Sequence, residues 1–223
     1  MIAFVGDSYC ADYYHTNPNN NRNHHNQRGW PNVVSEELES KIAVYGDGGK
    51  SWWYSWCIFA LNWAHKLDEL DAIVFCHTSN SRINNSWNEE LYQIPLDYDD
   101  NSQVALANKL YYKHIYDAQF HEFAQTQYAK MLREILSHKK TIHFTNYGLP
   151  ESILNILPGM VFSTPLMQIA VGGVTGTKDE IMHQVNVGGQ DHLANHLTEV
   201  NNQALGLLVA ESIQNYRPEQ YTI

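Results

Sequence analysis

The chain has 223 residues, 43% of them hydrophobic and 17% charged, and its formal net charge is −10 at pH 7. This composition excludes a disordered chain, and the length predicts one globular domain spanning residues 1–223. Only 14 residues are Lys or Arg, and they are spread along the chain, which argues against a nucleic-acid partner because such binding requires clustered basic residues. The acidic balance also disfavours anionic membranes and polyanionic substrates and leaves neutral substrates open.

No secretory signal is expected, because no basic start is followed by an apolar stretch. No run of about 18 apolar residues occurs, so no membrane span is expected either. The three cysteines are odd in number, and their spacing fits neither a zinc site nor a disulfide framework, which favours a reducing compartment. These features are compatible with a cytoplasmic or a virion-associated location.

The first part of the chain alternates between strand-like and helix-like patterns. The apolar run 1–6 stops at polar residues and predicts a buried parallel strand. The polar, Asn-rich segment 15–28 predicts a loop, and the segment 31–40 has apolar residues at the spacing of a short helix. The segment 41–46 predicts a second strand, and the aromatic-rich segment 51–66 predicts a helix capped by its first serine.

Strands and helices continue to alternate up to the C-terminus. The predicted elements are strand 71–77, irregular segment 84–100, helix 101–136 with a break near His114, strand 140–145, strand 160–170 interrupted by Pro165, and helix 198–214 with Thr198 as its N-cap. Such alternation predicts a three-layer α/β/α sandwich with a mostly parallel central sheet.

Polar clusters follow three of the predicted strands. They occupy residues 6–8, 46–49 and 78–81, and a fourth cluster, residues 191–196, comes shortly before the last helix. Because open parallel sheets bind ligands at the carboxyl ends of their strands, we expect the four clusters to converge on one crevice.

The clusters contain the groups that acyl transfer requires. A serine is a weak nucleophile at neutral pH and needs an adjacent base, commonly a histidine that a carboxylate orients. Ser8 is the candidate nucleophile, His196 the candidate base and Asp191 the candidate orienting carboxylate. His192, four residues before His196, is a competing base.

The oxyanion of a tetrahedral intermediate needs preorganised hydrogen-bond donors. Candidate donors are the backbone N–H groups of Ser8 and Gly46 and the side-chain amide of Asn80. A glycine at the end of the second strand would let a substrate approach the backbone closely. Gly46 and Asn80 are also compatible with ordinary turn positions.

The first two clusters resemble conserved blocks of the SGNH (GDSL-like) hydrolase family. Gly6-Asp7-Ser8, directly after an N-terminal strand, resembles the first block of that family. The segment 44–51 resembles the second block, whose usual form is Asn-x-Gly-x-x-Gly, with Gly46 at the oxyanion glycine and Val44 in place of Asn.

The last two clusters also resemble blocks of this family. The segment 78–81 resembles the third block, Gly-x-Asn-Asp, with Thr78 in place of Gly and Asn80 retained. The segment that starts at Asp191 resembles the last block, Asp-x-x-His, although four residues rather than two separate Asp191 from His196. The resemblance spans nearly the whole chain and implies an SGNH/flavodoxin-like α/β/α fold and hydrolysis of acyl esters with no metal and no cofactor.

A small-molecule or carbohydrate ester is the expected substrate. The Asn/His-rich segment 15–28 and the aromatic residues after the second block suit contacts with a sugar. Trp52 and Arg82 are candidate substrate contacts; alternatively, Trp52 belongs to the core and Arg82 forms a structural ion pair. The oligomeric state is left open.

Two other classes of function compete with a serine esterase. The departures from the family pattern in the second, third and last blocks are compatible with a catalytically weak or inactive binding module or a virion structural protein. A metal-dependent hydrolase would need ligands such as His15, His24 and His25, but no Cys or carboxylate stands at ligand spacing beside them, so no metal is expected.

Overall fold

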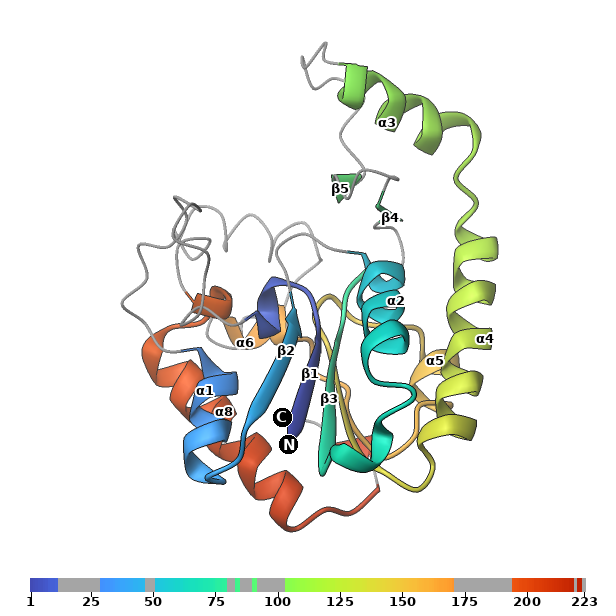
Figure 1. Cartoon of the computed structure of the whole chain (residues 1–223). Coiled ribbons are helices and arrows are strands. Elements are labelled where there is room, and N and C mark those ends of the chain that lie inside the picture. The colour runs from blue at the N-terminus through green and yellow to red at the C-terminus, as the bar shows by residue number, and fades with distance from the viewer. Residues whose placement is uncertain are drawn as a thin grey trace.

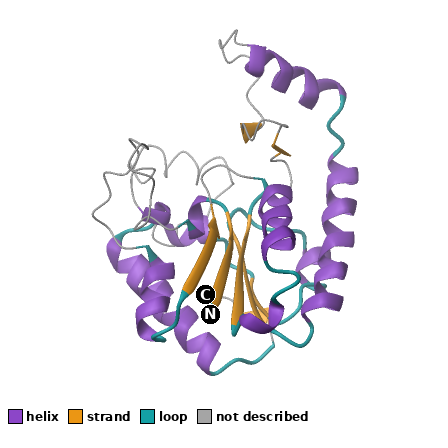
Figure 2. Ribbon diagram, in the orientation of Figure 1, coloured by secondary structure: helices purple, strands orange, loops and turns teal. Residues whose placement is uncertain are grey.

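The computed structural model describes residues 1–11, 29–46, 51–79, 83–84, 90–91, 103–170, 194–218 and 220–221. A central sheet lies between two layers of helices (Figures 1 and 2). The predicted three-layer α/β/α class with a mostly parallel sheet is therefore confirmed.

Within the described residues, six strands form the sheet in the order β2-β1-β3-β6-β7-β8, and every neighbouring pair is parallel. In chain order they are β1 Ile2–Gly6, β2 Ile42–Gly46, β3 Ala72–His77, β6 Lys140–Thr145, β7 Met160–Phe162 and β8 Gln220–Tyr221. Two short strands, β4 Ile83–Asn84 and β5 Glu90–Leu91, pair antiparallel outside this sheet. Because the strands are parallel, their carboxyl ends meet at one edge of the sheet.

The helices of the described residues lie between these strands in the sequence. They are α1 Trp30–Glu37, α2 Trp52–Asn62, α3 Gln103–His114, α4 Ala118–Leu136, α5 Glu151–Leu154, α6 Leu166–Ala170 and α8 Glu199–Gln214. The bodies of α1 and α8 lie side by side on one face of the sheet, and α2, α4 and α5 cover the other face (Figure 1).

Each face of the sheet has its own hydrophobic core, because successive side chains of a strand point to opposite faces. On β1, Phe4 packs with Trp30 of α1 and Val209 of α8. The neighbouring Val5 packs on the other face with Trp56 of α2 and Leu132 of α4. Burial on both faces explains why the strands are continuous apolar runs rather than alternating ones.

The helix boundaries follow from capping groups that the sequence contains. Ser51 accepts a hydrogen bond from the backbone N–H of Tyr54, and Thr198 accepts one from Asn201, so both predicted N-caps are confirmed. The predicted helical segment 101–136 is broken after His114 into α3 and α4, and Asp117 caps α4. The strand predicted over 160–170 is wrong in its second half: β7 ends at Phe162, and α6 begins at Leu166, directly after Pro165.

Of the helices in the described ranges, none combines the length and the apolar character that crossing a membrane would require.

Candidate active site

The loop that carries Ser8 begins where β1 ends. Asp7 caps a short 3₁₀ helix, Ser8–Cys10, and its Oδ1 accepts hydrogen bonds from the backbone N–H of Tyr9 at 3.0 Å and from Nδ2 of Asn146 at 2.6 Å. Asn146 comes directly after β6, so its buried side chain ties the ends of β1 and β6 together. Ser8 is thereby held at the carboxyl edge of the sheet, with 8% of its surface exposed.

Gly46 ends β2 beside this loop and pairs in register with Gly6. A Cβ atom at Gly46 would lie 2.8 Å from the carbonyl oxygen of Asp7 and 2.8 Å from the carbonyl carbon of Cys10. A glycine is therefore required here for the Ser8 loop to pack against β2. Its role as an oxyanion donor stays a prediction.

His196 reaches Ser8 from the opposite end of the chain. The distance from its Nε2 to Ser8 Oγ is 2.7 Å, across 188 residues of sequence. His196 lies in a short turn, Ala194–His196, just before α8, at the same edge of the sheet as the end of β1. When Nδ1 carries the ring proton, Nε2 accepts the hydroxyl proton of Ser8, which is the arrangement that a general base needs.

Aromatic residues support the imidazole. The ring of Tyr9 lies against His196 with a centroid separation of 4.8 Å and also contacts Tyr147. Tyr9 is itself fixed by Trp30, whose Nε1 donates a 2.6 Å hydrogen bond to the Tyr9 carbonyl oxygen. These contacts restrict the rotation of the imidazole and shield one of its faces from water.

Four of the predicted site residues fall outside the described residues: Asp191, His192, Asn80 and Arg82. The structure therefore brings together two of the three predicted catalytic side chains, those of Ser8 and His196. The orienting carboxylate and the amide donor to the oxyanion stay predictions.

Trp52 is described and is almost completely buried. Its side chain is 5% exposed and packs in the core between α2 and α4, with Tyr128 at a centroid distance of 6.0 Å. Its neighbour Trp53 is 58% exposed. Of the two indoles, that of Trp53 has the larger surface available to a ligand.

Two buried histidines lie on the α2 face of the sheet. The Nε2 of His77 and the Nδ1 of His143 are 2.9 Å apart, and both rings stack on Phe75. Burial lowers the pKa of His77 from 6.5 to about 4. Burial, together with the positive charge that His77 acquires on protonation, lowers the pKa of His143 well below its usual value. Both rings are therefore neutral at pH 7.

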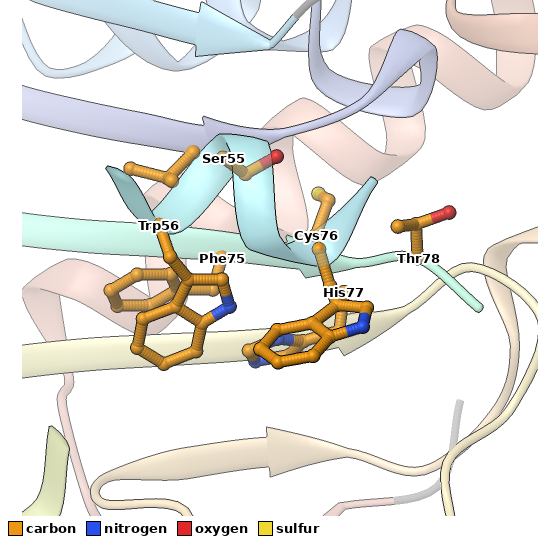
Figure 3. Close-up of a pocket in the computed structure, with 8 residues that line it drawn as sticks. Ser55, Trp56, Phe75, Cys76, His77 and Thr78 are labelled. Carbon is orange, nitrogen blue, oxygen red and sulfur yellow. The ribbon is translucent and has the colours of Figure 1, made fainter. Parts of the chain in front are cut away.

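A small cavity, about the size of one water molecule, lies beside His77. Figure 3 shows Trp56 next to Phe75 and His77 at this cavity. Ser8 and His196 do not line it, so it is separate from the candidate active site.

Two asparagines of the site were missed by sequence reasoning. Asn146 follows the strand 140–145, and the rule that selected the other clusters, polar residues at the carboxyl end of a strand, would have found it. Asn195 donates hydrogen bonds to the carbonyl oxygens of Ser8 and Ala11. The position of Asn195 next to His196 was the only signal in the sequence that indicated a role in the site.

No protein-family model matches the chain, and no curated protein sequence matches it. Among solved structures, it is similar to a candidate GDSL-like lipase from Parabacteroides merdae ATCC 43184, with 12% identity, a TM-score of 0.48, and 96% of this chain and 94% of that chain covered. It is also similar to the lipase/acylhydrolase from Enterococcus faecalis, with 16% identity, a TM-score of 0.42, and 99% and 98% covered.

A variant of an acetyl-xylooligosaccharide esterase from Geobacillus Stearmophilus is a further similar structure, with 14% identity, a TM-score of 0.48, and 95% of this chain and 93% of that chain covered. Similarity at this level assigns no activity to the chain.

Proposed function

We propose that the chain is a serine ester hydrolase in which Ser8 is the nucleophile and His196 the general base. The observation that carries the proposal is the 2.7 Å contact between Ser8 Oγ and His196 Nε2 at the carboxyl edge of a parallel sheet. This contact supports the proposal because acyl transfer requires a serine hydroxyl within hydrogen-bond distance of a basic imidazole.

The reaction has two halves. Ser8 Oγ attacks the ester carbonyl carbon while His196 Nε2 accepts the hydroxyl proton, and the imidazolium then gives this proton to the departing alcohol. In the second half water attacks the carbonyl carbon of the acyl-serine while His196 Nε2 accepts a proton from it, and the imidazolium then returns this proton to Ser8 Oγ as the acid is released. In this proposal the backbone N–H groups of Ser8 and Gly46 and the amide of Asn80 stabilise the oxyanion, and Asp191 orients the imidazole.

We extend the proposal to neutral esters, with O-acetylated carbohydrate as the substrate class. A net charge of −10 disfavours polyanionic substrates. The polar segment 15–28 and the exposed indole of Trp53 supply groups that suit a sugar. Trp52 and Arg82 stay candidate contacts, although the burial of Trp52 leaves it little surface for one.

Hydrolysis of a short-chain aryl ester tests the catalytic part of the proposal. Ser8→Ala should lower kcat by a factor on the order of 10⁶, to near the background rate. Ser212→Ala is a matched control, because Ser212 is equally buried, with 7% of its surface exposed, but lies in α8 roughly 20 Å along the helix from His196. Retention of more than about a tenth of the wild-type rate by Ser8→Ala would overturn the assignment. Absence of activity in the wild type would favour a binding module that kept the fold.

A further inference from the structure

Two consecutive residues before α8 have a left-handed backbone. The φ angle is +54° at Asn195 and +57° at His196. Residues other than glycine rarely adopt this conformation, and asparagine tolerates it best. The two residues form a sharp turn, and the His196 side chain reaches Ser8 from it. This strained turn lies at the proposed site, where strain of this kind is commonly found.

The side-chain amide of Asn195 is completely buried and uses both of its hydrogens. Nδ2 donates to the carbonyl oxygen of Ser8 at 3.1 Å and to that of Ala11 at 3.0 Å. Ser8 is the first residue of the 3₁₀ helix that carries the nucleophile, and Ala11 is its C-cap. The amide thus spans the whole helical turn.

The amide of Asn195 acts as a hydrogen-bond donor through Nδ2, and its oxygen Oδ1 has a different environment. Oδ1 of Asn195 accepts no hydrogen bond from the described residues. It lies against Gly29, where a Cβ atom would come within 2.4 Å of it. Glycine at position 29 leaves the space for the amide, and the two hydrogen bonds to carbonyl oxygens require an N–H₂ group, which neither aspartate nor leucine supplies.

We infer that Asn195 is a positioning residue that holds Ser8 and His196 in their reacting geometry; this inference rests on the proposed esterase function. Asn195 is joined covalently to the base and by a hydrogen bond to the nucleophile's own carbonyl group. The two chain segments therefore move together at this point. A displacement of 1 Å between reacting groups costs on the order of 100-fold in rate, so a single shared anchor has a large effect on kcat.

Two substitutions separate the backbone conformation from the hydrogen bonds. Asn195→Gly keeps the left-handed turn and removes both donors. Asn195→Asp keeps the shape and places one carboxylate oxygen, in the position of Nδ2, against both carbonyl oxygens. We expect both to lower kcat by about 100-fold on a short-chain aryl ester with KM changed by less than about threefold, because the substrate is not touched. If the buried charge of Asn195→Asp prevents folding, Asn195→Gly alone carries the test.

Thr141→Val is the control for general destabilisation. It removes a buried 2.9 Å hydrogen bond from Thr141 Oγ1 to the Pro158 carbonyl oxygen, near the amino end of β6 and away from Ser8. It should lower the melting temperature and leave kcat unchanged. A kcat loss of the same size in Thr141→Val and Asn195→Gly would overturn the inference, because both would then act through overall stability.

Crystal structures of the wild type and of Asn195→Gly decide the matter without reference to activity. The distance from Ser8 Oγ to His196 Nε2, 2.7 Å in the wild type, should exceed about 3.5 Å in the variant. An unchanged distance would overturn the inference even in an active enzyme. A wild type that hydrolyses no ester would refute the proposed function alone, and the measured distance would still show whether Asn195 positions the pair.

Discussion

Acidification should destabilise the fold through the buried pair His77 and His143. Well above pH 6.5 both rings are neutral in the folded and in the unfolded chain, and the pair gives no pH dependence. Below pH 6.5 the unfolded chain takes up protons that the folded chain refuses, because burial lowers the pKa of His77 to about 4. The free energy of unfolding therefore decreases as the pH is lowered from 6.5 to 4.

The size of this effect follows from linkage. Between pH 7 and pH 5, His77 alone should lower the free energy of unfolding by about 2 kcal/mol. The loss approaches about 3 kcal/mol at pH 4. His143, whose pKa is lowered in the same direction, adds to this loss. Urea denaturation followed by tryptophan fluorescence at pH 7, 6, 5 and 4.5 measures it.

Protonation of carboxylates also destabilises proteins in acid. A variant without the pair His77 and His143 is therefore the necessary reference. In His77→Phe/His143→Phe both members of the hydrogen bond become apolar, and the new rings can stack on Phe75. Between pH 7 and pH 5 the wild type should lose at least about 2 kcal/mol more than this variant. Equal losses in the two proteins would refute the argument that the histidines are buried in their neutral form.

His196→Ala should lower kcat about as much as Ser8→Ala, with no further loss in the double variant, whereas His192→Ala should lower kcat less. Steady-state kinetics measure the three effects, and a larger loss in His192→Ala than in His196→Ala would make His192 the base. Asp191→Asn should lower kcat by more than about 100-fold but by less than Ser8→Ala, because an orienting carboxylate stabilises the imidazolium, and an unchanged kcat would indicate a Ser–His dyad. Gly46→Ala would place a Cβ atom against the Ser8 loop, so labelling of Ser8 by a fluorophosphonate should slow by about tenfold or more; unchanged labelling would contradict the close packing of β2 on that loop.

The sheet could be predicted from the sequence because its strands are buried on both faces. Apolar runs located β1, β3 and β6 to within one residue, since the loss of hydrophobicity at each end coincides with the end of the strand. β8, Gln220–Tyr221, could not be predicted, because two residues show no periodicity and join the sheet only through β7.

The orientation of α2 illustrates a different limit. Nearly every residue of Trp52–Asn62 is apolar or aromatic, so helical spacing could not show which side faces the core. The sequence therefore left open whether Trp52 contacts a substrate or belongs to the core, and the structure shows it buried, with the neighbouring Trp53 exposed.

Those residues of the candidate site could be predicted that residue type and position in the chain are enough to locate. Ser8 follows the first strand and His196 precedes the last helix, and the topology places both at one edge of the sheet. Asn195 could not be found this way, since its hydrogen bonds depend on a left-handed turn and on carbonyl groups more than 180 residues away in sequence.

Covalent labelling tests the central claim most directly. The protein would be treated with a fluorophosphonate, digested and analysed by mass spectrometry, with His196→Ala treated in parallel. A site in which His196 activates Ser8 predicts one adduct, on Ser8, in the wild type and a rate of labelling lowered by orders of magnitude in the variant. No adduct in the folded wild type, or an adduct on a residue other than Ser8, would contradict it.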